Sequence, residues 1–465
     1  MDSSVIRLDG IKINNFKNVR DGELNFSNNR KNYRASIVGL YGQNGSGKTA
    51  LIDALSILKF ILRGSSVPLK YADYINVDSE YARIKYVFKI TDSADDDTEY
   101  KVEYELSLKK EEDTSYRNTE EEIGSAHYKT KLFDEVLSFT CKSEGKKSVK
   151  QVLIDTREGE VFGPRTKYDI LTGKNKSVLT DLIVAKKLSS ATARSYIFSS
   201  ELVNIIRENC NNEAYSFIIN SLVKYGNYEL FVIDSATAGR ISLNAMPLII
   251  GSRKHGAVVV SLNEGAVVPD DLIDSVKDVI ANMNIVLPEL IPGLLIDVKE
   301  MGTQLLRDGS PGVRIQLVSN KASREIPLEY ESEGIKKIIA ILQLLIAVYN
   351  KDSITVAIDE LDAGVFEYLL GEILRIISEK GKGQLIFTSH NLRPLETLDK
   401  GFVAFTTTNP AHRYIRLCNV KTNNNLRDFY YRDIILGEQN EPVYEPTHNS
   451  DIALAFREAG EIYGS

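Results

Sequence analysis

Short, almost wholly apolar runs in this chain are separated by longer segments with apolar residues at helical spacing. Three such runs cover residues 35–41, 353–358 and 384–388. Apolar runs of this length are typical of strands buried on both faces of a parallel sheet. Helical patterns at 50–58 and 365–380 follow the first two runs. The sequence therefore predicts an α/β fold with a central, mostly parallel sheet.

Other segments predict strands of a different kind. Residues 11–16 and 23–26 largely alternate apolar and polar positions, and further strands are expected at 82–90 and 100–108. Alternation is typical of antiparallel strands with one buried face. Between residues 166 and 300 helical patterns mix with short strands, which indicates a partly helical insertion. We divide the chain into a first head part (1–165), the insertion (166–300), a second head part (301–405) and a C-terminal segment (406–465).

The stretch between the first apolar run and its helix carries the clearest chemistry. Gly42-Gln43-Asn44-Gly45-Ser46-Gly47-Lys48-Thr49 has the spacing G-x-x-x-x-G-K-[ST] of a phosphate loop. Glycines let backbone N–H groups approach phosphate oxygens at a helix N-terminus. Lys48 would bind the β and γ phosphates, and Thr49 would hold Mg²⁺. The strand before the loop and the helix after it argue against a chance glycine-rich turn. The expected nucleotide contacts are Gly42, Asn44, Gly45, Ser46, Gly47, Lys48 and Thr49.

The second and third apolar runs each end in polar residues. Asp359 and Glu360 follow the second run, and Ser389-His390-Asn391 follows the third. Asp359 suits Mg²⁺, which prefers hard oxygen ligands, and Glu360 is a candidate base for an attacking water. A strand that ends in two acids is common and gains meaning only beside the phosphate loop. His390 is expected at the edge of the adjacent parallel strand, beside the nucleotide.

One further motif opens the long apolar helix that runs to residue 348. Ser332-Glu333-Gly334 places a hydroxyl and backbone N–H groups at the positive end of a helix dipole. Anions bind well at such a position. The alternative is that Ser332 only caps the helix.

Composition narrows the class of protein. The 465 residues are 43% apolar with a net charge of −7, which excludes a dedicated nucleic-acid binder. Residues 141–187 contain eleven Lys and Arg against six Asp and Glu, so nucleic-acid contact there is possible, although a solvated face is the favoured interpretation. Three distant cysteines and the absence of a signal peptide or membrane-spanning run lead us to expect a cytoplasmic protein without membrane contact. Sustained heptads are absent, which argues against a long coiled-coil arm.

The order of these motifs resembles the ABC-type P-loop ATPase head, and within it the branch of SMC, RecF and overcoming-lysogenization-defect ATPases. The opening Ile13-Asn14-Asn15-Phe16-Lys17 is similar to the first strand of that branch, which lies near the adenine and makes Lys17 a candidate nucleotide contact. The resemblance covers roughly the first ninety residues and residues 325–405. It implies ATP and Mg²⁺ as cofactors and ATP hydrolysis between two heads. Two departures are Glu333 within the Ser-x-Gly motif and the lack of a glutamine between Gln43 and Gln151, which leaves the family's Gln loop unplaced.

The same resemblance implies a role for each remaining candidate residue. Ser332 and Gly334 would contact the γ-phosphate bound to a second copy of the chain. Asp362, in the loop after the two acids, would run along the interface between the heads. His390 would sense the γ-phosphate, so Glu360, Lys48 and His390 are the expected catalytic residues.

Segments near the C-terminus narrow the resemblance further. Residues 390–396, 424–433 and 441–445 resemble the ATPase subunits of phage anti-restriction-induced defence systems. In that family the subunit is an oligomeric scaffold that holds a separate Toprim-type nuclease until a phage protein triggers release. We find no Toprim acidic pair here and expect an ATPase without its own nuclease. One alternative is a RecF-like DNA-maintenance ATPase that binds DNA when ATP closes the dimer. Another is a nucleotide-gated scaffold without hydrolysis, against which Glu360 argues.

Overall fold

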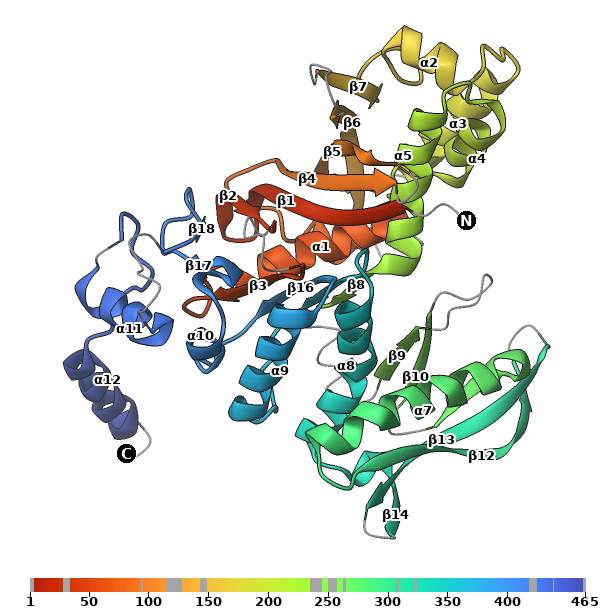
Figure 1. Ribbon diagram of the computed structural model, residues 1–465. Coiled ribbons are helices and arrows are strands. Elements are labelled where there is room, and N and C mark those ends of the chain that lie inside the picture. Colours follow the sequence, from red (N-terminus) through yellow and green to blue (C-terminus); the bar gives the residue numbers. More distant parts are fainter. Residues whose placement is uncertain are drawn as a thin grey trace, which may run out of the picture.

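Two six-stranded sheets enclose helix α1 (Lys48–Leu62) in the main body of the protein (Figure 1). The computed structural model describes residues 4–27, 34–92, 95–113, 128–142, 149–234, 245–249, 257–261, 265–306, 309–321, 324–417, 425–437 and 439–462. Twelve of the fifteen residues of α1 are buried. A helix that is apolar on all sides belongs between two layers, and α1 takes that position.

The first sheet is antiparallel and confirms the predicted strand lobe. Its order is β2-β1-β4-β5-β6-β7. The strands are β1 (Ser4–Phe16), β2 (Val19–Asn25), β4 (Tyr81–Asp92), β5 (Asp95–Glu112), β6 (Tyr128–Lys142) and β7 (Lys150–Asp155). Burial alternates along β4, where every second residue from Ala82 to Ile90 faces the core. That alternation is the physical basis of the sequence prediction.

The central sheet is the mostly parallel sheet that the apolar runs predict. Its order is β18-β17-β3-β16-β15-β8, and β18 is the one strand that pairs antiparallel. The strands are β3 (Ser36–Tyr41), β8 (Leu230–Ile233), β15 (Thr355–Ile358), β16 (Gln384–Thr388), β17 (Val403–Thr406) and β18 (Tyr414–Ile415). Parallel strands end at one edge of a sheet, so the polar residues after β3, β15 and β16 are brought to the same side.

Helices cover the remaining face of the central sheet. Helices α8 (Glu333–Asn350) and α9 (Glu367–Lys380) lie on the side opposite α1 (Figure 1). They share a core with β15 and β16 and with a lobe in which α7 (Ile273–Leu290) packs on a second antiparallel sheet. That sheet contains β11 (Ala266–Pro269), β12 (Leu295–Leu305), β13 (Pro311–Lys321) and β14 (Arg324–Pro327). Strands β9 (Ala245–Ile249) and β10 (Ala257–Ser261) pair with each other.

Four helices stand beside the antiparallel sheet: α2 (Arg165–Leu171), α3 (Val178–Ala191), α4 (Ser200–Asn209) and α5 (Glu213–Lys224). Contacts of α2, α3 and α5 with β7, β6 and β1 attach this group to the first sheet. Short 3-10 segments occur at Leu69–Tyr71, Asp270–Leu272, Leu328–Tyr330 and Lys400–Phe402, and a π-helical turn at Tyr225–Glu229.

The predicted limits of the insertion and of the second head part need correction. Strand β8 lies inside the predicted insertion, yet it is the edge strand of the central sheet beside β15. The predicted boundary at residue 300 falls within β12. The boundary after residue 405 also fails, because β17 extends to Thr406 and pairs with β18. Short strands take their place from tertiary pairing, which local patterns do not encode.

Helix α10 (Pro394–Thr397) follows β16, and the C-terminal segment contains α11 (Leu426–Leu436) and α12 (Asn449–Ile462) (Figure 1). Side chains of α11, including Phe429 and Tyr430, join the core around α8 and α9. Within the described part of the chain, none of the helices combines the length and apolar character that a membrane span requires.

Candidate functional site

The loops after β3, β15 and β16 surround a cavity of about 340 Å³. Its walls are formed by Lys17, Asn18, Asn44, Gly45, Gly47, Lys48, Thr49, Ala50, Asp359, Glu360, Thr388 and His390. The cavity thus brings together the phosphate loop, both acids, the histidine and the opening strand. Gly42, Ser46, Ser332, Gly334 and Asp362 are candidate residues that do not line it.

The phosphate loop is held in a shape that excludes side chains at two positions. Gly42 has φ = 151°, and a Cβ there would clash with the side chain of Thr406 in β17. Gly47 has φ = 94° and stands at the N-cap of α1. The loop therefore turns directly into the start of a buried helix, whose free N–H groups favour an anion.

Lys48 lies at the floor of this loop. Its side chain is buried, and Nζ donates to the carbonyl oxygens of Gly42 (2.7 Å) and Gln43 (3.0 Å). Burial lowers the pKa of Lys48, while the carboxylates of Asp359 and Glu360 act in the opposite direction. The ammonium is thus held inside the loop, close to two acids, where a phosphate would compensate its burial.

The two acids after β15 have different environments. Asp359 is 1% exposed, and its Oδ1 accepts a hydrogen bond from the Thr388 hydroxyl (2.6 Å). Its Oδ2 is buried and has no hydrogen-bond partner among the residues that the structure describes. Glu360 is exposed to the cavity, has φ = 49°, and donates its backbone N–H to the same Thr388 hydroxyl (2.8 Å). A buried carboxylate oxygen without a donor fits a hard cation such as Mg²⁺, and Thr49 lines the same cavity.

Thr388 is a site residue that sequence reasoning missed. It is the last residue of β16, and its hydroxyl connects both acids to the neighbouring strand. The position was predicted to be strand, but its function depends on the parallel register of β15 and β16. The one sequence feature that could have indicated this role is that Thr388 is the polar last residue of an otherwise apolar run.

His390 and Asp362 are linked through the backbone. Asp362 Oδ2 accepts from the N–H groups of His390 (3.1 Å) and Asn391 (2.9 Å), while Oδ1 is buried and has no partner within the described part of the chain. The His390 side chain is exposed and lines the cavity. Asp362 therefore fixes the histidine loop within its own chain, and its predicted place along a dimer interface stays a prediction.

Ser332 and Gly334 lie at the N-terminus of α8, away from the cavity walls. Ser332 is exposed, and its Oγ accepts the N–H of Ile335 (3.4 Å). It therefore caps α8, as expected from the alternative interpretation of the Ser-x-Gly motif. A Cβ on Gly334 would clash with the carbonyl oxygen of Gly364, so α8 begins in close contact with the loop after the acids. The predicted contact of Ser332 with a partner's nucleotide stays a prediction.

Lys17 is positioned by an unusual backbone and two side chains. It has φ = 52°, forms an ion pair with Asp53 of α1, and its Nζ lies 4.1 Å from the centre of the Tyr74 ring. Asp53 follows Thr49 by one helical turn, and sequence reasoning did not identify it. Asn18, also unpredicted, donates its side-chain amide to the carbonyl oxygen of Gly45.

Residues from the C-terminal segment complete the support of the phosphate loop. The Tyr414 hydroxyl donates to the Gly47 carbonyl oxygen (3.0 Å), and Arg413 donates to the Asn18 carbonyl oxygen (2.6 Å). Gln43 Oε1 accepts the backbone N–H of Glu445 (3.0 Å). These contacts bridge hundreds of residues, so no local motif could have predicted them.

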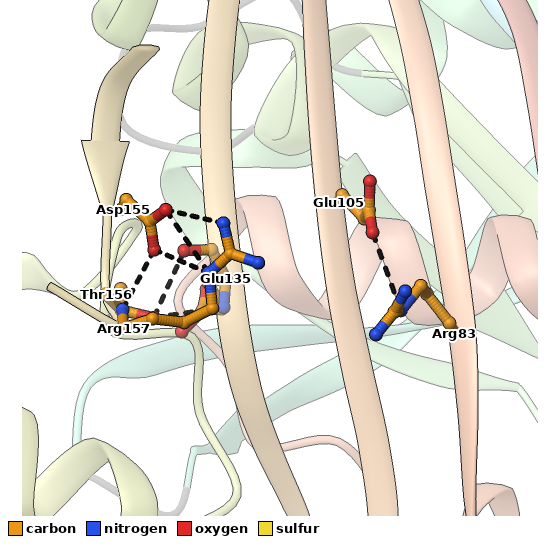
Figure 2. Close-up of polar contacts among 6 residues, drawn as sticks. All are labelled: Arg83, Glu105, Glu135, Asp155, Thr156 and Arg157. Atoms are coloured by element: carbon orange, nitrogen blue, oxygen red, sulfur yellow. Dashed lines mark hydrogen bonds and ion pairs between the residues drawn. The ribbon is translucent and has the colours of Figure 1, made fainter.

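The basic span around residues 141–187 uses part of its charge internally. Arg157 forms an ion pair with Asp155 (2.6 Å), and Lys150 pairs with Glu103 (2.6 Å). Lys186 donates to the Thr156 carbonyl oxygen (2.8 Å). Figure 2 shows Arg157 folded back onto Asp155 beside the strand that carries Glu135. These contacts are those of a solvated, ion-paired face.

Comparison with known proteins identifies a family whose model matches most of the chain. A family model described as RecF/RecN/SMC N terminal domain matches residues 7–412. An SMC head bound to the C-terminal winged-helix domain of ScpA is 13% identical, with 88% of this chain and 97% of that chain covered and a TM-score of 0.39. The SMC head domain from Thermotoga maritima is 13% identical, with 88% and 99% covered and a TM-score of 0.35. The recombination mediator protein RecF-ATPrS of the RecFOR pathway is 12% identical, with 89% and 98% covered and a TM-score of 0.35. No curated protein matches the chain.

Proposed function

The chain belongs to the RecF/RecN/SMC N-terminal domain family, and we propose that it hydrolyses ATP with Mg²⁺ in the cavity between the phosphate loop and the two acids. Its SMC/RecF-like ATPase head has the α/β fold of that family. One observation carries the proposal: Lys48, Asp359 and Glu360 line the same cavity at the carboxyl edge of a parallel sheet.

Each group in the cavity has a defined task in this proposal. Lys48 would exchange its two loop carbonyls for β and γ phosphate oxygens, and the N–H groups at the start of α1 would bind the same phosphates. Asp359 and Thr49 would hold Mg²⁺, which neutralises charge on the phosphates when bound. Glu360 would accept the proton of the attacking water. His390, in the loop after β16, would donate a hydrogen bond to the γ-phosphate.

The direct test is ATP turnover of three variants, measured as phosphate release. We expect Lys48→Ala to lose nucleotide binding and Glu360→Gln to bind ATP but turn over about 100- to 10,000-fold more slowly. Glu367→Gln removes an exposed carboxylate at the start of α9 and serves as the control, with turnover unchanged. Turnover that survives both site substitutions would contradict the proposal.

We further propose that two heads share the chemistry. Ser332 is exposed at the N-terminus of an 18-residue helix, and the cavity of its own chain does not include it. A second copy could present this helix end, with Gly334, to the γ-phosphate bound by the first. ATP-dependent dimers of Glu360→Gln in light scattering would support this arrangement. A strictly monomeric protein with full turnover would exclude it.

In the cell, the best-supported role is a nucleotide-dependent scaffold that holds a separate effector, a nuclease, in antiphage defence until a phage protein triggers release. The support is the resemblance of residues 390–396, 424–433 and 441–445 to defence ATPases. The contact of Gln43 with Glu445 adds a physical link, because the phosphate loop directly meets one of these segments. Affinity purification from cells should recover a stoichiometric partner whose release depends on phage infection. Recovery of no partner, with unchanged phage protection in Lys48→Ala, would contradict the role.

A RecF-like DNA-maintenance ATPase is the second candidate function. Family membership favours it, and residues 141–187 supply the local excess of positive charge. It predicts ATP-dependent DNA binding that weakens steeply with salt, because phosphate contacts release counterions. Absent or salt-independent binding at low ionic strength would exclude this candidate.

A further inference from the structure

A second lysine near the acids has no role in the mechanism described so far. Lys337 lies in α8, five residues after Ser332, and is 1% exposed. Its Nζ donates to the backbone carbonyl oxygen of Glu360 (3.4 Å). The carboxylates of Asp359, Glu360 and Asp362 are the charges that face it. A buried ammonium is costly unless it is paired, so this one is placed for a reason beyond packing.

The residue that Lys337 contacts has a strained backbone. Glu360 has φ = 49°, a region that non-glycine residues seldom adopt and that the surrounding contacts must hold. Its N–H is bound by the Thr388 hydroxyl (2.8 Å). Its carbonyl oxygen accepts from the N–H of Ala363 (3.1 Å) and from Lys337 Nζ. Contacts from β16, from the following loop and from α8 thus hold this single residue in place.

We propose that Lys337 is a positioning residue for Glu360, which keeps the carboxylate aimed at the attacking water. The proposal rests on the ATPase function proposed above. Rotation of the Glu360 peptide would swing its side chain away from the cavity, and displacements of about 1 Å reduce turnover strongly. Helix α8 begins at Ser332 and Gly334, which would face a partner's nucleotide. Through Lys337 the same helix contacts Glu360, the proposed general base of its own site.

The preceding residue provides a matched comparison. Lys336 is 4% exposed, but its Nζ pairs with Glu333 (2.6 Å) and donates to the Glu329 carbonyl oxygen (3.4 Å). It therefore points toward the outer end of α8 instead of the acids. Lys336→Met removes a buried ammonium from the same helix without touching Glu360.

Steady-state phosphate release by the full chain tests the proposal. We expect Lys337→Met to lower kcat at least about tenfold while KM for ATP changes less than about threefold. Lys337→Arg, which keeps the charge and the donors, should recover part of the loss. Lys336→Met should retain kcat, and the thermal midpoint of Lys337→Met should match that of Lys336→Met. A wild-type kcat in Lys337→Met would overturn the proposal, as would a loss shared equally by Lys336→Met.

A double substitution separates positioning from a general structural role. If Lys337 acts through Glu360, then Lys337→Met adds no further loss to Glu360→Gln, whereas independent effects multiply. A multiplied loss would overturn the proposal. Should Lys337→Met not fold, Lys337→Gln replaces it, because the glutamine side chain is too short to reach the same carbonyl oxygen. A wild-type kcat in that variant would likewise overturn the proposal. If Glu360→Gln leaves wild-type turnover intact, the ATPase mechanism itself fails, and that result is distinct from every outcome above.

Discussion

Two buried carboxylates of this protein lie in opposite environments. Glu135 in β6 is 3% exposed and has both oxygens bound, by the hydroxyls of Tyr104 (2.7 Å) and Ser195 and by the N–H of Tyr196 (2.8 Å). Asp359 is 1% exposed, and none of the described residues forms a hydrogen bond with one of its two oxygens. The first carboxylate joins the antiparallel sheet to the segment between α3 and α4. The second carboxylate, Asp359, lines the cavity with an oxygen that can accept a ligand.

The difference is the one expected between a carboxylate that joins two parts of the fold and a carboxylate that is free to take a ligand. A buried carboxylate is stable when hydrogen-bond donors surround it, as at Glu135. An oxygen left bare in the interior raises the free energy of the folded chain unless a cation binds there. The protein therefore leaves an oxygen unsatisfied at Asp359 and leaves none at Glu135, in accord with the proposed cation site at the first and a fixed joint at the second.

Among the substitutions that probe this contrast, that of Asp359 should have the largest effect on activity. Asp359→Asn removes the charge but keeps the shape and the oxygen that faces Thr388, so we expect a folded protein with turnover about 100- to 1,000-fold lower. The dependence of turnover on Mg²⁺ concentration should shift to higher values. Phosphate release across a Mg²⁺ titration measures both. Unchanged Mg²⁺ dependence would argue that the bare oxygen does not serve a cation.

Substitution of Glu135 should affect stability instead. Glu135→Ala leaves buried donors of Tyr104, Ser195 and Tyr196 without an acceptor, which should cost about 3 kcal/mol or more of unfolding free energy. Turnover per folded molecule should not change. The control is Glu105→Ala: Glu105 pairs with Arg83 at 3.5 Å on the half-exposed face of neighbouring strands (Figure 2), so its loss should cost less than about 1 kcal/mol. Equal costs, measured by urea unfolding, would contradict the comparison.

A smaller effect on turnover is expected at the N-terminus of α8, where Ser332 is exposed and no buried carboxylate is disturbed. Ser332→Arg places a bulky cation where a second head would dock and should lower turnover about tenfold or more. Each chain should remain folded, because Ser332 makes only a capping contact at 3.4 Å. Light scattering with ATP and phosphate release provide the two measurements. Normal turnover in this variant would show that one chain completes the site alone.

The sequence alone predicted Asp359 but not Glu135, and the reason is physical. Asp359 directly follows a strand of four buried residues, and the neighbouring Glu360 and the phosphate loop are recognisable from local spacing. Glu135 is defined by partners 31 to 61 residues away in strands and turns that meet only in the folded chain. Tyr414, which lies 367 residues from Gly47, supports the phosphate loop in the same non-local manner. Motifs encode the groups that touch a ligand, whereas the groups that hold them depend on tertiary pairing.

The smallest predicted effect is a dependence of stability on pH. Burial raises the pKa of Glu135 above its ordinary value of 4.5, and its hydrogen-bond donors oppose the shift without reversing it. Between the unfolded and the raised folded pKa, the folded state holds more protons than the unfolded state, so the free energy of unfolding decreases as pH rises through that window. Glu135→Gln cannot titrate and should lack this decrease.

Urea unfolding of wild type and Glu135→Gln at several pH values from about 4.5 upward isolates the contribution of this carboxyl group. The difference between the two proteins matters, because other carboxylates titrate in both. The pKa of Asp155, for example, is lowered by its hydrogen bond with Arg157 and shifts stability in the opposite direction. If the difference is independent of pH, burial does not dominate at Glu135. The carboxylate would then be held by its donors as firmly as an exposed ion is held by water, and the contrast with Asp359 would be sharper still.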